Sequence, residues 1–258
     1  MKTSLLICAF CVFFVQAAGG HAAEASVQTL IARGDSAYDA FDNETALQLY
    51  QRAQEADSSN CEVLWKLARA HVDVGESAGE ELQRQHYTLA EQIDRRAVEL
   101  CPDNADAHLG LAIAVGRVAL LEGGKKKVRL SREVKAEAEK ALELDPNMDI
   151  AHHVLARWHR EVANLSGLLK MFAKVLYGGL PPASHDTAVE HFQKAIELNP
   201  TYINHHLELG ITYEDMKMWA EAAESYSKVA ELPESDSGDA GHKEEAAQRL
   251  LKVSKKLD

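Results

Sequence analysis

The side chains with the clearest binding chemistry are four arginines, which recur at helical spacing together with a tryptophan and a histidine. The guanidinium group presents a planar fork of donors that fits a carboxylate or a phosphate. A surface that gathers such groups predicts binding of an acidic peptide segment or a lipid head group. The predicted groove-binding residues are Trp65, Arg69, Arg117, His153, Arg157 and Arg160.

The same side chains admit a purely structural interpretation. Local acids such as Asp73 and Glu161 could pair with the arginines across adjacent helices, and each exposed pair would contribute well under ~1 kcal/mol. Trp65 is either an anchor for a partner or a residue packed between structural units. The sequence leaves both interpretations open.

Histidines occur in two adjacent pairs, His152-His153 and His205-His206, and imidazole is a common ligand of zinc and copper. Neighbouring residues of a helix point about 100° apart, so neither pair can chelate a metal from one face. We therefore expect no metal and no cofactor. His108, His152 and His206 each lie six residues after a proline, which favours a packing role between helices.

Motifs typical of catalysis do not occur. The sequence has no Gly-x-Ser-x-Gly, no His-Glu-x-x-His and no catalytic signature around a cysteine. The run Gly123-Gly124-Lys125-Lys126-Lys127 is similar to a phosphate-binding loop, but it lacks the Ser or Thr after the lysine and no strand precedes it. We expect a non-enzymatic protein.

The N-terminus has the pattern of a secretory signal peptide. A lysine at position 2 precedes an unbroken apolar run from Leu5 to Val15, and an Ala-x-Ala site follows. This run is shorter than the roughly 20 residues needed to span a bilayer, so an uncleaved membrane anchor is the weaker alternative. We expect cleavage of residues 1–25 and a secreted or periplasmic protein that consists of residues 26–258.

Two cysteines, Cys61 and Cys101, lie in the expected mature protein. An oxidising compartment allows them to form a disulfide. If they lie at the meeting ends of two antiparallel helices, the disulfide would contribute roughly 2 to 4 kcal/mol. Two buried thiols are the alternative.

Charge composition narrows the class of partner. The 258 residues contain 28 Lys and Arg against 40 Asp and Glu, a formal net charge of -12. Phosphate affinity comes mainly from Lys and Arg, so we expect no nucleic-acid partner. The balance of 46% hydrophobic and 26% charged residues is typical of a folded soluble domain.

Internal repeats organise the chain. Variants of one helix-closing phrase recur four times, at residues 54–58, 97–102, 141–146 and 195–200. Small and large residues alternate between them at the positions where paired helices of a tetratricopeptide repeat interdigitate. The sequence predicts an all-α, right-handed superhelical solenoid of about five helix pairs, forming one domain over residues 26–258. A charged amphipathic helix from about Gly241 to Asp258 would cap its end.

In such a solenoid the first helix of each pair lines a concave groove, and the six predicted binding residues fall on that face. The middle repeats are longer than the usual ~34 residues, because Pro102 and Pro146 are 44 residues apart and Pro146 and Pro200 are 54 apart. Insertions of this kind usually emerge on one face and often bind partners.

The last insertion carries an apolar stripe at three- and four-residue steps. Packing of this stripe into the core, against the following helix, is the interpretation we favour. A lipid- or membrane-contacting edge, flanked by Lys170 and Lys174, is the alternative. The stripe consists of Leu165, Leu168, Leu169, Phe172, Val175 and Leu176.

The chain resembles the regulator of microtubule dynamics family from about Ala46 to its C-terminus. The resemblance is carried by LWKLARA at residues 64–70, EVANLS at 161–166 and LYGGLPPAS at 176–184. It implies a non-catalytic tetratricopeptide-like binding fold, with associations to microtubules, mitochondria, organelle contacts and lipid. An exported protein does not meet microtubules, so only the fold transfers directly.

We therefore expect a scaffold that holds a protein or peptide, with an acidic segment, in an arginine-containing groove. The alternative is a lipid-binding or lipid-transfer module that uses the groove and the apolar stripe.

Overall fold

The computed structural model describes residues 26–257. The expected signal peptide, residues 1–25, lies outside the described residues. The described part consists of twelve helices without a strand, which confirms the all-α prediction. Five helix pairs stack in sequence, α8 interrupts the fourth pair and α12 follows the fifth. The helices are α1 (Val27–Asp39), α2 (Asn43–Ala56), α3 (Cys61–Ser77), α4 (Glu80–Leu100), α5 (Ala105–Leu120), α6 (Gly124–Leu144), α7 (Asp149–Asn164), α8 (Gly167–Tyr177), α9 (His185–Leu198), α10 (Ile203–Asp215), α11 (Trp219–Glu231) and α12 (Asp239–Ser254).

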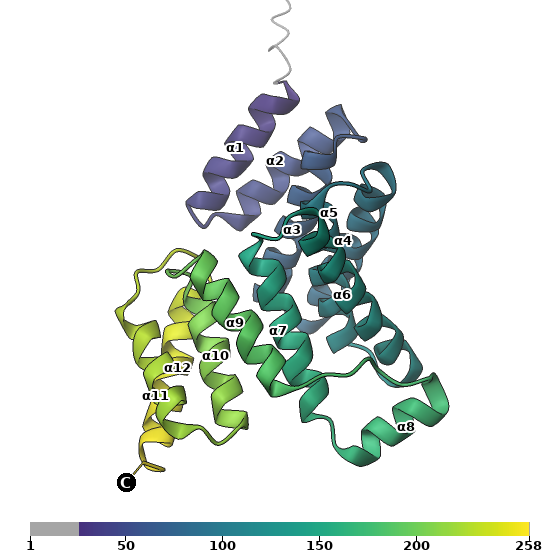
Figure 1. Ribbon diagram of the computed structural model, residues 1–258. Coiled ribbons are helices and arrows are strands. Elements are labelled where there is room, and N and C mark those ends of the chain that lie inside the picture. Colours follow the sequence, from purple (N-terminus) through teal and green to yellow (C-terminus); the bar gives the residue numbers. More distant parts are fainter. Residues whose placement is uncertain (1–25, 258) are drawn as a thin grey trace, which may run out of the picture.

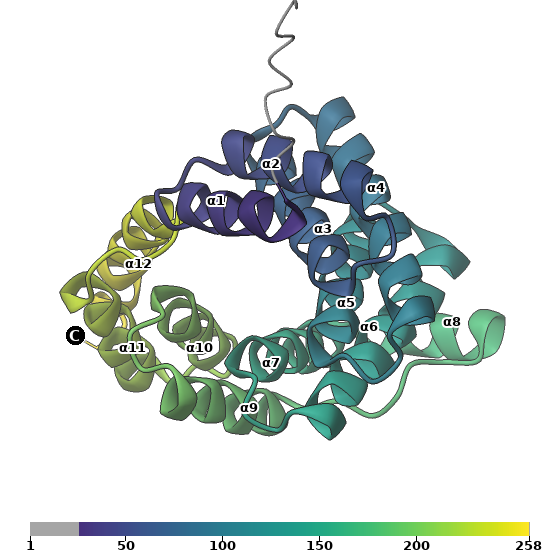
Figure 2. The same ribbon diagram turned by 90° about the horizontal axis from the view of Figure 1, so that it is seen from above.

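The stack curves until the α1–α2 turn meets the segment between α11 and α12 (Figures 1 and 2). Seen from above, α1, α3, α7 and α10 face the centre, whereas α4, α9 and α11 lie outside. The Asn43 side-chain amide donates to the Ser237 hydroxyl at 3.2 Å, across 194 residues of sequence. The first helices of the pairs therefore form an inner face that is almost encircled by the chain.

Tyrosine packs directly on glycine in the terminal pairs. A Cβ atom added to Gly34 would lie 2.5 Å from the Tyr50 ring, and one added to Gly210 would lie 2.5 Å from the Tyr226 ring. Both tyrosines are fully buried, and the Tyr50 hydroxyl donates to Asp35 at 2.7 Å. Any larger residue at these glycines would push the two helices of the pair apart.

The spaced histidines join successive repeats, as their regular position indicated. Nε2 of His108 lies 2.9 Å from the carbonyl oxygen of Pro102, and Nε2 of His206 lies 2.9 Å from that of Pro200. His152 makes the same contact with Pro146 at 3.4 Å. In each unit the imidazole thus binds a carbonyl of the turn that precedes its own helix.

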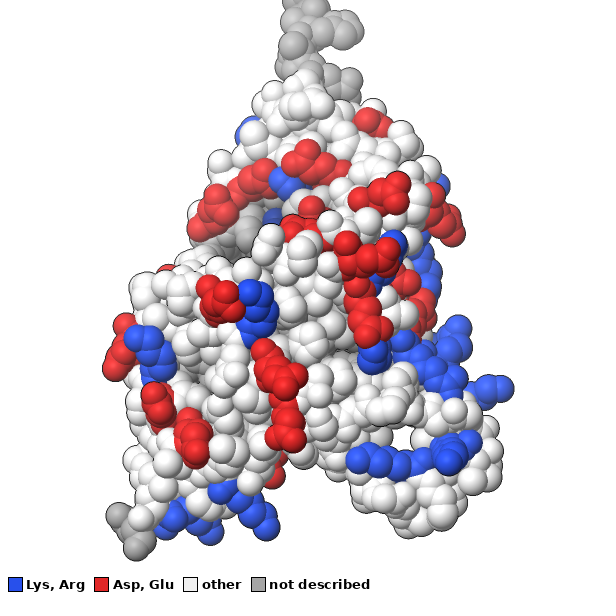
Figure 3. Space-filling model, viewed as in Figure 1, with Lys and Arg blue, Asp and Glu red and all other residues white. Residues whose placement is uncertain are grey.

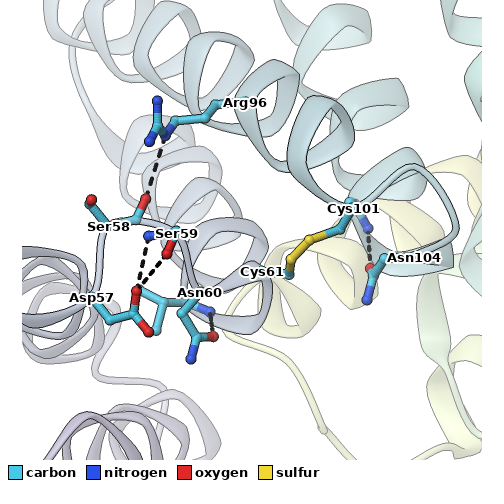
Figure 4. The surroundings of a disulfide bond; sticks show 10 residues. Asp57, Ser58, Ser59, Asn60, Cys61, Arg96, Cys101 and Asn104 are labelled. Carbon is cyan, nitrogen blue, oxygen red and sulfur yellow. Dashed lines mark hydrogen bonds between the residues drawn. A yellow bond between two sulfur atoms is a disulfide. The ribbon is translucent and has the colours of Figure 1, made fainter.

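A disulfide joins Cys61, at the start of α3, to Cys101, at the end of α4 (Figure 4). Their Cα atoms lie 6.4 Å apart, within the range that disulfides span. Asn60 caps α3 by accepting from the Val63 amide at 3.2 Å, and this cap sets the first turn on which Cys61 lies. The bridge closes the second helix pair at the end opposite its α3–α4 turn.

Candidate functional site

Arg69 lies on the inner face between aromatic side chains. Its guanidinium carbon is 3.7 Å from the centre of the Tyr38 ring and 5.2 Å from that of Trp65. Trp65 and Arg69 are both half-buried on α3. The Arg69 Nε atom is buried and has no hydrogen-bond partner among the described residues, which is a costly state for a charged group.

Asp73 lies one helical turn beyond Arg69 and borders a cavity of about 230 Å³. Its Oδ2 atom is also buried without a partner among the described residues. Desolvation raises the pKa of Asp73 to about 7, against the attraction of Arg69 and with help from the repulsion of Glu76 and Asp236. The cavity lies between the α1–α2 turn, α3 and the segment that joins α11 to α12, and it is lined by Tyr38, Asp39, Phe41, Asn43, Asp73, Ser235, Asp236 and Ser237.

Three of the four predicted groove arginines contact carboxylates of the chain itself. Arg117 pairs with Glu76. Arg157 lies 3.3 Å from Glu208 through Nε, and Arg160 pairs with the same carboxylate. These ion pairs match the alternative in which the arginines stabilise the fold. The carboxylate that Arg157 and Arg160 share belongs to Glu208, which is distant in the sequence, whereas we had considered acids close in the sequence.

The Arg160–Glu208 pair is buried, with 5% and 10% of the two side chains exposed. Burial alone would raise the pKa of Glu208, but Arg157 and Arg160 hold it below its ordinary value. Arg160 also approaches Glu161 at 3.2 Å. The carboxylate ties α10 to α7, so this cluster acts as a link between repeats.

His153 is buried between helices rather than open to the groove. Its Nδ1 atom lies 2.9 Å from Nδ1 of His205, and its ring meets Phe192 edge to face at 5.3 Å between centroids. Nε2 of His205 lies 3.1 Å from Asp149. Burial keeps the pKa of His153 well below its ordinary value. The structure therefore brings Trp65 and Arg69 to one open face and leaves His153 in the packing.

The apolar stripe on α8 is exposed, so our expectation that it packs against the following helix is wrong. Val175 is 75% exposed, Leu176 59%, Leu168 58% and Phe172 48%. The helix packs mainly on α6 and projects from the outer side of the molecule (Figures 1 and 2). Leu169 is exposed too, whereas Leu165 is half-buried. The short α8 buries only Ala173 and turns its apolar arc outward.

Neither a membrane span nor a metal cluster is found in residues 26–257. No described helix combines the length and hydropathy of a membrane span. Within the same residues, no three His, Cys, Asp or Glu side chains are arranged to hold an ion.

The family model for regulator of microtubule dynamics proteins 1–3 matches residues 30–255, nearly the whole described chain. This chain belongs to the regulator of microtubule dynamics family. It is 30% identical to the bovine regulator of microtubule dynamics protein 1, over 89% of this chain and 73% of that protein. It is also 30% identical to the mouse protein 1, over 91% of this chain and 77% of that protein.

A solved tetratricopeptide-repeat structure supports the family fold. A thermophilic protein of this class from Thermus thermophilus superimposes with a TM-score of 0.65, at 18% identity, over 88% of this chain and all of that one. At this identity the similarity establishes the architecture alone. Solenoids of this class use extended concave surfaces for binding, and α3, the helix that carries Trp65 and Arg69, faces the centre of the curved stack.

The cavity was missed at the sequence level. Tyr38 and Asp236 are almost two hundred positions apart, and no local pattern indicates that the stack curves far enough to bring them together. Met171, 52% exposed on the apolar arc of α8, was missed as well. Helical spacing could have identified it, since it lies one residue before Phe172 and four before Val175.

Proposed function

We propose that this protein is a non-catalytic scaffold that holds a peptide segment of a partner protein against the inner face of α3. One observation carries the proposal. Nε of Arg69 and Oδ2 of Asp73 are a donor and an acceptor without a partner among the described residues. Asp73 borders the cavity, and Arg69 stacks on Tyr38, which also lines it.

The spacing of the two groups fits a peptide backbone. Residues four apart on a helix lie about 6 Å apart on one face. An extended chain repeats its carbonyl and amide groups on one side about every 6.7 Å. A bound segment can therefore offer a carbonyl to Arg69 and an amide N–H to Asp73, with Trp65 and Tyr38 covering its side chains.

In this proposal, Arg69 is the arginine that recognises the acidic segment expected from the sequence. Arg117, Arg157 and Arg160 already have carboxylate partners, whereas Arg69 has none within 4.0 Å among the described residues. An acidic side chain of the segment next to Arg69 would add a charge-assisted hydrogen bond. Asp39 and Asp236 at the cavity would disfavour further acidic residues there.

Site-specific photocrosslinking tests the proposal. A photoreactive amino acid replaces Trp65 on the inner face, and in a control variant it replaces Leu82, which is 55% exposed on α4. We expect the Trp65 variant alone to capture a discrete protein from the native source, through a short segment. Identical capture from both positions would overturn the proposal.

Binding of the captured segment is then measured with Arg69→Ala and Asp73→Ala. Arg69→Ala should weaken binding by about tenfold or more, since it removes a hydrogen bond to a charged group worth about 1.5–3 kcal/mol. Asp73→Ala should weaken it by about threefold or more, since a pKa of about 7 leaves this carboxyl only partly charged. Arg249→Ala, a half-buried arginine on α12, is the matched control. An unchanged affinity in Arg69→Ala would remove this site from the interaction.

Lipid binding or transfer is the second candidate, favoured by the exposure of the apolar stripe on α8. The cavity on the inner face is a less suitable site for an acyl chain, because three aspartates line it. An organic extract of the purified protein discriminates the two functions. Stoichiometric lipid would favour the carrier, and its absence together with a captured protein favours the scaffold.

We propose that the scaffold acts outside the cytosol, in an exported form. The disulfide between Cys61 and Cys101 supports this proposal, because such bonds persist in oxidising compartments. The mass of the secreted protein should match a chain that begins near Ser26. Relatives are named regulators of microtubule dynamics, but we do not propose that this chain binds microtubules. Cosedimentation of the chain with polymerised tubulin would contradict this part of the proposal.

A further inference from the structure

The outer surface around α8 combines exposed apolar side chains with cations that have no carboxylate partner among the described residues. Its exposed side chains form an arc of about 160° on the helix, taking 100° per residue. On the same spacing, Lys174 lies about 60° beyond Met171, at one border of the arc, whereas Lys170 lies opposite the centre of the arc. We call this region the α8 corner. Its apolar arc consists of Leu168, Leu169, Met171, Phe172, Val175 and Leu176.

The α8 corner is basic in an acidic protein. Residues 162–185 contain two lysines and no Asp or Glu, and residues 123–132 contain five Lys or Arg and no Asp or Glu. These segments meet, because the Arg132 guanidinium donates to the carbonyl oxygen of Tyr177 at 2.6 Å. Figure 3 shows Lys and Arg gathered over α8 and the adjoining surface, whereas the acidic residues of that view lie scattered over the rest of the molecule, among other Lys and Arg.

Most of these cations lack an acidic partner within the described residues. Lys126 pairs with Glu122 at 2.9 Å, and Lys170 donates to the Ala163 carbonyl at 2.9 Å. Six of the seven have no carboxylate within 4.0 Å in residues 26–257, namely Lys125, Lys127, Arg129, Arg132, Lys170 and Lys174.

Three lysines also occupy an unfavourable position. Lys125, Lys126 and Lys127 lie in the first turn of α6, which has no side-chain cap. The positive end of the helix dipole repels cations there. An anion bound at this turn would relieve the repulsion and would accept hydrogen bonds from the free amides.

We propose that the α8 corner docks on the surface of an anionic lipid bilayer. The apolar arc enters the boundary between head groups and acyl chains, while α8 lies in the membrane plane. Lys174 reaches from the border of the arc to the head groups, and Lys170, on the far side of α8, adds positive charge near the membrane surface. The lysines at the start of α6 contact anionic head groups beside it. The inner face stays free to hold its peptide.

Vesicle cosedimentation of the purified chain tests this docking. We expect binding to phosphatidylcholine vesicles that contain phosphatidylserine, at least about tenfold weaker binding to phosphatidylcholine alone, and weakening by salt. If the chain bound neither kind of vesicle, or bound both kinds equally, the proposal would be overturned.

Two sets of variants locate the surface. Leu168→Ser/Phe172→Ser/Val175→Ser should abolish binding, whereas the control Leu82→Ser/Leu251→Ser, at 55% and 69% exposed positions, should not. Lys170→Ala/Lys174→Ala should weaken binding about tenfold or more, and Lys194→Ala/Lys228→Ala on α9 and α11 should leave it unchanged. Circular dichroism checks that each variant is folded.

A second copy of the chain is the competing occupant of the apolar arc. Light scattering of the wild type and the triple serine variant separates the two. A wild-type dimer that becomes monomeric in the variant, without vesicle binding, would overturn membrane docking. A wild-type monomer that binds vesicles supports it.

Discussion

The inner face and the α8 corner both carry cations, but they use them differently. On the inner face, Arg160 lies buried against Glu208, and Arg117 meets Glu76. At the α8 corner, Lys174 is exposed and has no carboxylate nearby in the described chain. Pairing with a carboxylate therefore distinguishes Arg117, Arg157 and Arg160 from the cations that are available to a partner, which are Arg69 on the inner face and the unpaired cations of the α8 corner. Residue type and spacing do not make that distinction.

The largest expected difference between the regions is in stability. Glu208→Ala leaves Arg160 and its charge buried without its main partner, and this should lower the free energy of unfolding by about 3–5 kcal/mol. Lys174→Ala should change it by less than about 0.5 kcal/mol. Urea denaturation followed by circular dichroism measures both. If the free energy of unfolding fell by a similar amount in both variants, the two regions would not differ in their contribution to stability.

The disulfide sharpens the comparison because it constrains α3 and α4 but not α8. Cys61→Ser/Cys101→Ser should cost about 2–4 kcal/mol and should speed amide hydrogen exchange in α3 and α4 more than in α8. The oxidised wild type should be lighter than the reduced form by the mass of two hydrogen atoms. Alkylation of both cysteines without prior reduction would contradict the bridge.

A lower pH should reduce the stability of the fold through histidines packed between the helices, and not through the α8 corner. Desolvation lowers the pKa of His71 and of His191 to about 4, from 6.5. Both stay neutral in the folded state, whereas the unfolded chain binds protons below pH 6.5. Stability is therefore complete above about pH 6.5 and is lost as the pH falls toward 4, by about 2 kcal/mol for each group.

Thermal denaturation between pH 7.5 and 4.5 checks this expectation. His71→Gln/His191→Gln should flatten the decline, and the triple serine variant of α8 should keep the wild-type slope. An equal decline in the histidine variant and the wild type would show that other groups cause the loss.

The smallest expected effect is a serine substitution on the apolar arc. Val175→Ser, at a side chain that is 75% exposed, should change stability by less than about 0.5 kcal/mol. Leu155→Ser, at a buried position of α7, should cost about 3 kcal/mol or more. Comparable losses at the two positions would mean that α8 is covered in solution.

The sequence predicted the fold because its evidence is local. Each repeat ends with the same phrase, and histidines six residues after Pro102 and Pro200 do contact those prolines. The five helix pairs and the helix that follows them come from signals within one unit of the chain. The family resemblance, now confirmed, rests on equally local motifs.

The candidate sites were only partly predictable, because they depend on contacts between distant residues. Arg160 and Glu208 are separated by 48 positions, and periodicity does not indicate that one carboxylate serves two arginines. The stripe around Phe172 was recognised as apolar, but a pattern within one helix cannot say whether a neighbour covers it. The cavity beside Asp73 depends on the curvature of the whole stack.

Separate binding at the two surfaces is tested most directly by one set of paired isotherms. Affinity for the captured peptide segment and for phosphatidylserine-containing vesicles is measured on the wild type, Arg69→Ala and the triple serine variant of α8. We expect Arg69→Ala to lose the peptide and keep the vesicles, and the α8 variant to do the reverse. Loss of both ligands in either folded variant, or retention of the peptide by Arg69→Ala, would contradict the assignment of two independent surfaces.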